Sequence, residues 1–211
     1  MSEIAKKNAA FQALNYLHSD CVLGIGTGST VNYFIEALKD HRHKLSAVVS
    51  SSEQSTQKLR SLGIPVVELM EVGSQLDLYI DGADEINPQK EMIKGGGGAL
   101  TREKILAECA RQFICIVSPE KCVEVLGKFP LPLEILPLAR GLVARKIIAL
   151  GGTPKLRENF KTDQGNFILD VIGLDLSRPI EMELKLSQIP GVFAAGVFAL
   201  RPADQILMGH P

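Results

Sequence analysis

The sequence predicts an α/β protein: a Rossmann-like, mostly parallel sheet with helices on both faces, joined to a smaller α+β domain of the ferredoxin-like type. Three observations lead to this prediction. Strand-like and helix-like segments alternate through residues 3–117. Several strand-like segments are apolar throughout, which is typical of parallel strands buried on both faces. After residue 128 the predicted order becomes β-α-β-β-α-β, the order of a ferredoxin-like unit.

In the first half, hydrophobic spacing and helix-ending residues identify the elements. The helix after residue 30 has apolar side chains at the spacing i, i+3, i+4 and i+7, namely Val31, Phe34, Ile35 and Leu38. Serines precede another helix and Gly63 ends it. The remaining predictions are helices at 3–17, 51–63 and 101–112, and strands at 21–25, 45–49, 65–69, 76–80 and 113–117.

A proline-punctuated segment, FPLPLEILPLA, marks the change to the second domain. The elements predicted after it are strands at 132–136, 155–160, 166–172 and 192–198 and helices at 138–150 and 179–188. A last strand in QILMG returns to the first sheet. The predicted domains are residues 1–127 plus 199–211, and residues 128–198.

Composition excludes several classes of function. The chain has 211 residues, 45% of them apolar, and a net charge of −1. Without a basic tract, binding to nucleic acid is not expected. No stretch reaches the roughly 18 apolar residues of a membrane span, and the charged N-terminus has no signal-peptide core. We therefore expect a cytoplasmic protein without a membrane partner, with reduced thiols and no cluster of ligands for a transition metal.

The first motif is the glycine-serine loop GIGTGST at residues 24–30, between a strand and a helix. Backbone N–H groups at a helix start, together with hydroxyl groups, suit a phosphate. A dinucleotide fingerprint would need glycine or alanine at its sixth position, where this chain has Ser29. A Walker A loop is absent. A capped strand–helix turn without a ligand is the alternative.

The second motif is DGADEINPQKEMIKGGGGALTREK at residues 81–104, which follows an apolar strand. Its chemistry-bearing residues are Asp81, Asp84, Lys94, four glycines at 95–98 and Glu103. A turn stabilised by the aspartates, a magnesium site and a flexible glycine loop are the alternatives. Glu103 alone could simply oppose the helix dipole. Arg102 and Lys104 are interpreted as surface charges.

Together these motifs suit proton transfer on a small sugar phosphate. If the first loop holds a phosphate, the sugar would face the second motif. Moving a carbonyl between C1 and C2 needs a base for the C2 proton, and Glu103 suits this task. Lys94 and the glycine N–H groups could stabilise an enediolate, and Asp81 and Asp84 could handle hydroxyl protons during ring opening. A metal-dependent hydride shift would need a carboxylate/His site, which is not evident.

The motifs resemble one family. The segments GIGTGST, SSSEQST, DGADEIN, KGGGGALTREK and LGKFPLPLEI are similar, in order and spacing, to those of ribose-5-phosphate isomerase A. The resemblance runs nearly from end to end. It implies an aldose–ketose isomerase that interconverts D-ribose 5-phosphate and D-ribulose 5-phosphate through an enediol(ate), without a cofactor, in the non-oxidative pentose phosphate pathway.

The resemblance also implies residue roles. Glu103 corresponds to the general base, with Asp81, Asp84 and Lys94 as the other catalytic residues. The implied substrate-binding residues are Thr27, Gly28, Ser29, Thr30, Asp81, Gly82, Ala83, Asp84, Lys94, Gly95, Gly96, Gly97 and Lys121. An N-terminal lysine near the phosphate is Lys6 or Lys7. The family forms homodimers or homotetramers, so the resemblance also implies that the smaller domain, residues 128–198, is involved in oligomerisation. One departure is Gly98, where the family commonly has alanine.

Two other classes of protein remain as hypotheses. A phosphosugar sensor would need no catalytic pair, and such regulators carry a DNA-binding module for which two α/β domains leave no room in this chain. A CoA-transferase relative would use a covalent carboxylate nucleophile. Turnover of a sugar phosphate, or labelling of a glutamate by acyl-CoA, would distinguish these hypotheses.

Overall fold

The computed structural model describes residues 3–210 and divides them into two compact units. The first unit comprises the chain up to Gly82, Ile105–Lys121 and the chain from Ala203 onward. The second comprises Ala83–Lys104 and Cys122–Pro202. This division differs from the predicted domains at residues 83–104, 122–127 and 199–202. It falls inside the DGAD motif and inside the helix that carries Glu103.

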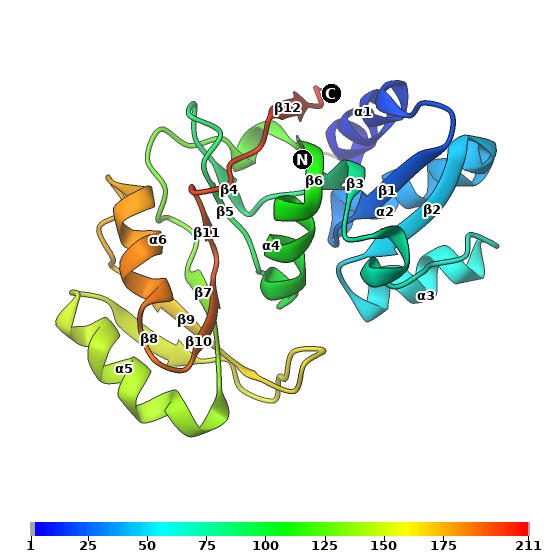
Figure 1. Cartoon of the computed structure of the whole chain (residues 1–211). Helices are drawn as coiled ribbons and strands as arrows, with labels where there is room; N and C mark the ends of the chain where they lie inside the picture. Colours follow the sequence, from blue (N-terminus) through cyan, green and yellow to red (C-terminus); the bar gives the residue numbers. More distant parts are fainter. Residues whose placement is uncertain (1–2, 211) are drawn as a thin grey trace. The chain divides into compact units, whose positions relative to one another are not determined.

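The first unit is built on a five-stranded parallel sheet (Figure 1). Its strands are β1 (Cys21–Ile25), β2 (Leu45–Ser50), β3 (Leu76–Asp81), β6 (Ala110–Val117) and β12 (Gln205–Met208), in the order β12-β6-β3-β1-β2. Consecutive residues of β3 from Leu78 to Asp81 are buried. Since successive side chains point to opposite faces, the sheet is covered on both faces, as predicted.

The helices of the first unit follow the predicted spacing. They are α1 (Glu3–Ala13), α2 (Ser29–Leu38), α3 (Glu53–Ser61) and the second half of α4 (Leu100–Cys109), with 3₁₀ turns η1 (Leu14–Tyr16), η2 (Lys39–Lys44), η3 (Leu69–Val72) and η4 (Pro119–Lys121). The four apolar residues predicted for one face of α2 are all buried. Ser52 caps α3 by accepting the N–H of Ser55, so the predicted serine cap is confirmed.

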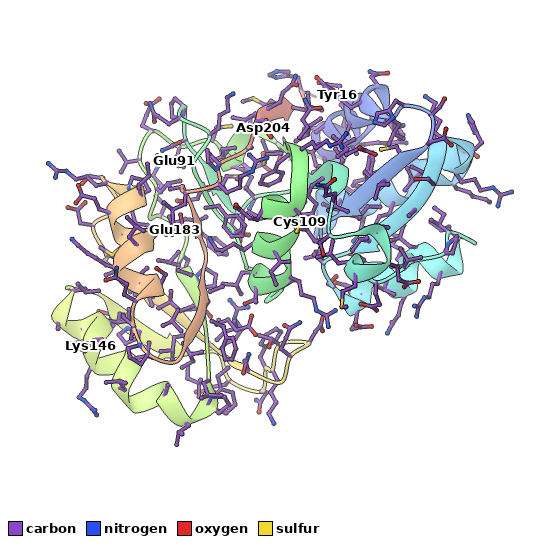
Figure 2. The ribbon with its side chains drawn as sticks, viewed as in Figure 1. Tyr16, Glu91, Cys109, Lys146, Glu183 and Asp204 are labelled. Carbon is purple, nitrogen blue, oxygen red and sulfur yellow. The ribbon has the colours of Figure 1, made fainter. Side chains whose placement is uncertain are left out.

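The returning strand β12 is fixed by side chains labelled in Figure 2. Asp204 Oδ2 accepts the N–H of Phe113 at 2.7 Å, and the side-chain amide of Gln205 donates to the Tyr16 hydroxyl. β12 lies beside β6 in parallel register. The predicted return of QILMG to the first sheet is therefore confirmed. No helix among residues 3–210 is both long and apolar enough to span a membrane.

The second unit contains the ferredoxin-like arrangement. Its elements are β7 (Leu131–Ile135), η5 (Pro137–Ala139), α5 (Arg140–Ala149), β8 (Thr153–Leu156), β9 (Phe167–Ile172), α6 (Pro179–Ser187) and β10 (Val192–Ala195). The strands form an antiparallel sheet in the order β10-β7-β9-β8. A further sheet of two-residue strands, β4 (Glu85–Ile86), β5 (Met92–Ile93) and β11 (Val197–Phe198), is not predicted from the sequence.

Two buried carboxylates, one accepting side-chain donors and the other backbone N–H groups, hold loops of the second unit in place. Glu134 on β7 is 0% exposed and accepts hydrogen bonds from the side chains of Thr101, Thr162 and Asn166. Glu85 accepts the N–H groups of residues 127 and 129 at 2.7 and 2.5 Å. A buried carboxylate needs hydrogen-bond donors around its oxygens, and both residues have them. Glu85 and Glu134 therefore have structural roles in the motifs and need no catalytic role.

Several predicted boundaries are wrong. Residues 65–69 form no strand, and only the Val67 N–H reaches β2, at the Val48 carbonyl. The strand predicted at 155–160 ends at Leu156, and residues 157–166 connect β8 to β9. The strand predicted at 192–198 is divided at Gly196, whose N–H bonds to the Pro132 carbonyl. These segments have strand-like composition, but a neighbouring strand pairs with only part of each segment or with none of it.

Candidate active site

In the first unit, the glycine-serine loop lies where the order of the strands reverses. β1 lies between β2 and β3 in the sheet. The chain therefore moves from β1 to the neighbour on one side, β2, and later places β3 on the other side. In open parallel sheets such a switch point leaves a crevice at the carboxyl ends of the strands, where ligands bind. Residues 26–30 follow β1 at this end, and Asp81 is the last residue of β3.

Asp81 anchors this loop. Its side chain is 0% exposed. Oδ1 accepts the N–H groups of Thr27 at 3.1 Å and Gly82 at 2.7 Å, and Oδ2 accepts the Tyr79 hydroxyl. A Cβ atom on residue 26 would lie 1.9 Å from this carboxylate, so only glycine fits there. The carboxylate thus fixes the path of the chain from β1 into α2, and its role in proton transfer stays a prediction.

The N-terminus of α2 follows directly, with Gly28 as its N-cap and Ser29 as its first residue. First-turn N–H groups have no acceptor within the helix, and with the helix dipole they favour an anion. A hollow of about 280 Å³ beside this turn is lined by Glu3, Lys6, Ser29, Asn32, Tyr33, Glu36 and Lys58. Lys6 therefore lies near the loop, whereas the Lys7 ammonium lies 5.5 Å above the ring of Phe11.

Lys121 ends the 3₁₀ turn that follows β6, at the same edge of the parallel sheet. The pKa of the neighbouring Glu120 lies below its usual value, first because polar groups of residues 118 and 120 stabilise its carboxylate. Lys121 and Lys6 also lower this pKa through their positive charge. Two cations therefore act at this edge of the first unit, where an anion would be stabilised.

In the second unit, Lys94 and Glu103 form a buried ion pair. Lys94 Nζ lies 3.3 Å from Glu103 Oε2, and their side chains are 2% and 3% exposed. Lys94 directly follows β5, and its N–H donates to the Gly196 carbonyl at 2.8 Å. Glu103 lies in the first turn of α4. Removing one partner of a buried pair typically costs about 3–5 kcal/mol, because the remaining charge is uncompensated.

Asp84 holds the glycine loop, residues 95–98, which separates the two charged residues. Its Oδ2 accepts the Gly96 N–H at 2.7 Å, and its own N–H donates to the Ile93 carbonyl at 2.8 Å. Asp84 is half-buried and Gly97 is exposed. The second unit thus gathers several predicted site residues around one loop: Ala83, Asp84, Lys94, Gly95, Gly96, Gly97 and Glu103.

The sequence predicts Lys104 as a surface charge, whereas its side chain is only 28% exposed and is paired. Its Nζ donates to Glu183 Oε1 at 2.5 Å and to the Val197 carbonyl at 2.7 Å, and lies 3.9 Å from the Phe198 ring centroid. Figure 2 labels Glu183 on α6. Burial lowers the pKa of Lys104, and the Glu183 carboxylate opposes that shift. The sequence gives no signal for this contact, because Glu183 lies 79 positions away.

Three side chains of the kinds that bind metal ions lie close together at the opposite edge of the first unit's sheet. His18, Cys21 and Asp77 each offer one ligand atom within 4.8 Å of the others, although the sequence predicts no such cluster. Asp77 already accepts the Val22 N–H at 2.9 Å and lies 3.4 Å from the Arg111 guanidinium. Burial, followed by the Asp77 charge, raises the pKa of the Cys21 thiol to about 11. Since metals bind the thiolate, we assign this group no role.

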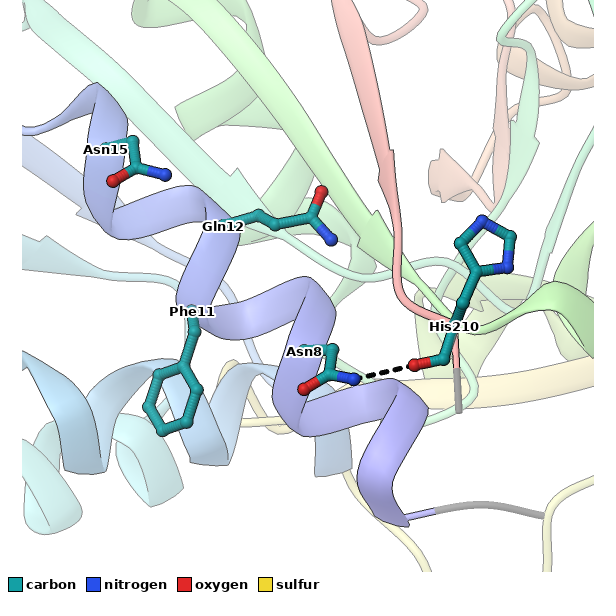
Figure 3. A pocket seen from close by; sticks show the side chains of 5 residues that line it. All are labelled: Asn8, Phe11, Gln12, Asn15 and His210. Carbon is teal, nitrogen blue, oxygen red and sulfur yellow. Dashed lines mark hydrogen bonds between the residues drawn. The ribbon is translucent and has the colours of Figure 1, made fainter.

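A larger hollow, about 470 Å³, lies in the first unit beside α1 (Figure 3). Asn8 donates its side-chain N–H to the His210 carbonyl at 2.7 Å. The other lining residues are Phe11, Gln12 and Asn15. The lining contains amides, a phenyl ring and an imidazole but no lysine or arginine that could pair with a phosphate. This hollow therefore does not match the predicted phosphate site.

The fold and the site define a class of protein. A parallel sheet with a glycine-serine loop and a helix N-terminus at its switch point is typical of α/β proteins that bind small phosphorylated ligands. A buried lysine–glutamate pair beside a glycine loop adds an acid–base group and hydrogen-bond donors. This combination is typical of enzymes that transfer protons on such ligands.

Comparison with known proteins gives the family. The chain belongs to the ribose 5-phosphate isomerase A (phosphoriboisomerase A) family, whose model matches residues 47–211. A protein named ribose-5-phosphate isomerase A from Francisella tularensis subsp. novicida is 54% identical over 203 residues, which cover 96% of this chain and 90% of that protein.

Solved structures agree with this assignment. The crystal structure of ribose 5 phosphate isomerase A from Neisseria gonorrhoeae is 46% identical, with a TM-score of 0.97 over 100% of this chain and 94% of that one. A D-ribose-5-phosphate isomerase in complex with phospho-erythronic acid is 36% identical, with a TM-score of 0.90 over 96% and 93% of the two chains.

Replacing Asp81 by asparagine tests the anchor. An amide cannot accept all of the hydrogen bonds that the carboxylate accepts, so a buried donor loses its partner. We expect the free energy of unfolding in urea to fall by about 2–3 kcal/mol. Asp40→Asn, at an exposed position, should change it by less than about 0.5 kcal/mol. Equal stabilities of the two variants would contradict the anchoring role.

Proposed function

We propose that this chain interconverts D-ribose 5-phosphate and D-ribulose 5-phosphate through an enediol(ate), in the non-oxidative pentose phosphate pathway. The family assignment supports the reaction. The observation that carries the chemistry is the buried Lys94–Glu103 pair next to a glycine loop. Aldose and ketose are isomers, so a proton-transfer route needs no external oxidant and no cofactor.

The phosphate is bound by the glycine-serine loop. Thr27, Gly28, Ser29 and Thr30 supply hydroxyl groups and the first-turn N–H groups of α2, which favour an anion. Lys6 shares the hollow beside Ser29 and adds positive charge, and Lys121 contributes from the end of β6. Of the two N-terminal lysines, Lys6 is the one we propose, because the Lys7 ammonium lies over Phe11.

Opening of the furanose ring requires a proton to leave the C1 hydroxyl and another to reach the ring oxygen. We assign this exchange to Asp84. Asp84 is half-buried and bound to the glycine loop, whereas Asp81 is fully buried and accepts three hydrogen bonds from the chain. Asp81 then serves the site by fixing the phosphate loop, and Gly82 and Ala83 connect the two aspartates.

Isomerisation of the open aldose moves one proton and one carbonyl. Glu103 removes the C2 proton, the C2–H electrons form the C1=C2 bond, and the C1=O π electrons move to O1 to give an enediolate. The C2 hydroxyl then passes its proton to O1. Finally the ketone forms at C2 while the protonated Glu103 delivers its proton to C1. Lys94 and the N–H groups of the glycine loop stabilise the negative oxygen during these steps. The Lys94 ammonium, 3.3 Å from Oε2, stabilises the carboxylate form of Glu103, which is the form that accepts a proton.

A sensor without catalysis and a CoA-transferase relative remain the other classes. A sensor would bind a sugar phosphate without converting it, and a transferase would form a covalent glutamate intermediate. The family assignment and the buried acid–base pair favour the isomerase. Conversion of D-ribose 5-phosphate by the purified chain in EDTA distinguishes it from both.

Association into a homodimer or homotetramer is a further part of this proposal, as is a cytoplasmic location. Several apolar side chains of the second unit are exposed near β10, the edge strand of its sheet. Leu138 is 92% exposed and Phe193 is 56% exposed. Their segments are joined by a hydrogen bond from the Leu136 N–H to the Gly191 carbonyl. Exposed apolar patches of this kind mark contacts with other chains.

The role of Glu103 predicts a specific loss of rate. Glu103→Gln keeps the shape of the side chain and removes its basicity, so kcat should fall at least ~10²-fold. The assay follows ketulose formation from D-ribose 5-phosphate in EDTA. Glu108→Gln, an exposed position on the same helix, is the matched control and should keep kcat. Near-wild-type activity of Glu103→Gln would exclude it as the base.

The phosphate site predicts an effect on KM. Thr30→Ala and Lys6→Met should raise KM for D-ribose 5-phosphate with little change in kcat, because phosphate contacts persist through the reaction. Lys7→Met is the matched control and should leave KM unchanged. D-ribose, which lacks the phosphate, should react equally with all four proteins. A fall in kcat without a change in KM would contradict phosphate binding by these residues.

The association surface predicts a change in molar mass. Light scattering should give two or four times the 22.9 kDa of one chain. Leu138→Asp should shift the population toward single chains, because a charge would be buried in the interface. Met70→Asp is the control, since Met70 is 87% exposed in the first unit. A wild-type protein of 22.9 kDa would contradict the proposed oligomer.

A further inference from the structure

The connection between β8 and β9, residues 157–166, contacts the glycine loop at two points that the proposed mechanism does not use. Arg157 Nη1 donates to the Gly96 carbonyl at 3.0 Å. Phe160 packs against Leu100 and occupies the space beside Gly98, where a Cβ atom would lie 2.2 Å from its ring. Gly98 has φ +79°, which also favours glycine.

Arg157 is itself held in one orientation. Its Nε donates to Asp170 Oδ2 at 2.9 Å and its Nη2 to Asp170 Oδ1 at 2.5 Å, which makes a two-pronged pair with β9. The guanidinium lies 5.2 Å from the Phe160 ring centroid, and the Arg157 side chain is 19% exposed. A guanidinium already bound along one edge by two hydrogen bonds loses little further entropy when its remaining nitrogen, Nη1, donates to another acceptor.

The rest of the connection is tied to the start of α4. Glu134 accepts the hydroxyls of Thr101 on α4 and Thr162 in the connection, at 2.5 and 2.7 Å. Arg102 on α4 lies 3.8 Å from Asp163. The far part of the connection is therefore bound to the helix end that follows the glycine loop.

These contacts fix the direction of one backbone donor. In a trans peptide the C=O and the following N–H point in opposite directions, and no cis peptide bond occurs among residues 3–210. Because the Gly96 carbonyl points to Arg157, the Gly97 N–H points away from it. Asp84 fixes the preceding peptide through the Gly96 N–H at 2.7 Å. Two successive peptides of the loop are thus oriented by side chains.

We infer that Arg157, held by Asp170 and Phe160, is a positioning residue that aims the Gly97 N–H at the oxygen on which negative charge develops. The inference rests on the proposed isomerase function, which supplies that oxygen. Gly97 is exposed, so a substrate can approach this part of the loop. Without Arg157 the glycine loop would rotate about its own soft dihedrals and the donor would be misaligned.

The test compares Arg157→Met with Lys155→Met, an exposed cation on β8. Arg157→Met should lower kcat for D-ribose 5-phosphate about 10- to 100-fold, the range for a misplaced or lost donor. KM should stay within about threefold, since the phosphate contacts remain. Millimolar guanidinium chloride should restore part of kcat in Arg157→Met, and potassium chloride should not. Lys155→Met should behave as wild type.

Asp170→Asn provides a second variant in case Arg157→Met does not fold. It keeps the arginine but weakens its two-pronged pair, and kcat should fall with the thermal unfolding midpoint close to that of wild type. Wild-type kcat in a folded Arg157→Met or Asp170→Asn protein would overturn the inference. A rise in KM with unchanged kcat would also overturn it, because the loop would then serve binding alone.

A double-mutant cycle tests the Phe160 contact. Gly98→Ala should lower kcat because its methyl group meets the Phe160 ring. Phe160→Val in the same chain should restore part of it, and the strain of alanine at positive φ limits the recovery. Additive effects of the two changes would contradict the coupling. Absence of isomerisation by the wild-type protein would instead refute the proposed function, so the two failures are distinguishable.

Discussion

The buried ion pair between Lys94 and Glu103 is the interaction on which the proposed chemistry depends. Neither charge would be stable at 2–3% exposure without the other. The pair therefore requires that the end of β5 and the first turn of α4 keep a fixed position relative to each other. The glycine loop between them must turn within a few residues, which explains its composition. A backbone hydrogen bond from Lys94 to Gly196 and the contacts of Asp84 and Arg157 complete this arrangement.

The buried carboxylates have different tasks, which their partners reveal. Asp81, Glu85 and Glu134 accept hydrogen bonds from backbone N–H groups, hydroxyls or amides and so hold loops in place. Glu183 accepts the N–H groups of residues 199 and 200 and pairs with Lys104. Glu103 differs because it pairs with the ammonium of another proposed catalytic residue. A carboxylate in that setting is suited to accept a proton rather than to fix a turn.

Much of the fold could be predicted because its elements have strong local signals. The apolar spacing of α2, the serine cap of α3 and the βαββαβ order each appear directly in the sequence. The two-residue strands β4, β5 and β11 are too short for any periodicity, and their pairing is decided by distant segments. The segment 65–69 has strand composition, but it contacts β2 through a single hydrogen bond.

The site was predictable only to the level of residue types. The motifs identify Asp81, Asp84, Lys94 and Glu103 as site residues. Their spacing cannot show that the Asp81 carboxylate accepts hydrogen bonds from Thr27, Gly82 and Tyr79. Arg157 and Phe160 gave no signal, because they lie about 60 positions from the glycines they contact. Lys104 looked like any charged helix residue until its contact with Glu183 was known. Long-range polar contacts of this kind are decided by tertiary packing rather than by local pattern.

Hydrogen-isotope transfer during turnover in deuterium oxide tests the central claim most directly. If a carboxylate removes the C2 proton and returns one to C1, D-ribulose 5-phosphate formed in EDTA should carry deuterium at C1, observed by NMR. Carbon-bound deuterium should be lost in Glu103→Gln along with turnover. Turnover that is abolished by EDTA and restored by a divalent ion, with no deuterium at C1, would indicate a metal-dependent hydride shift between the carbons and would contradict the account.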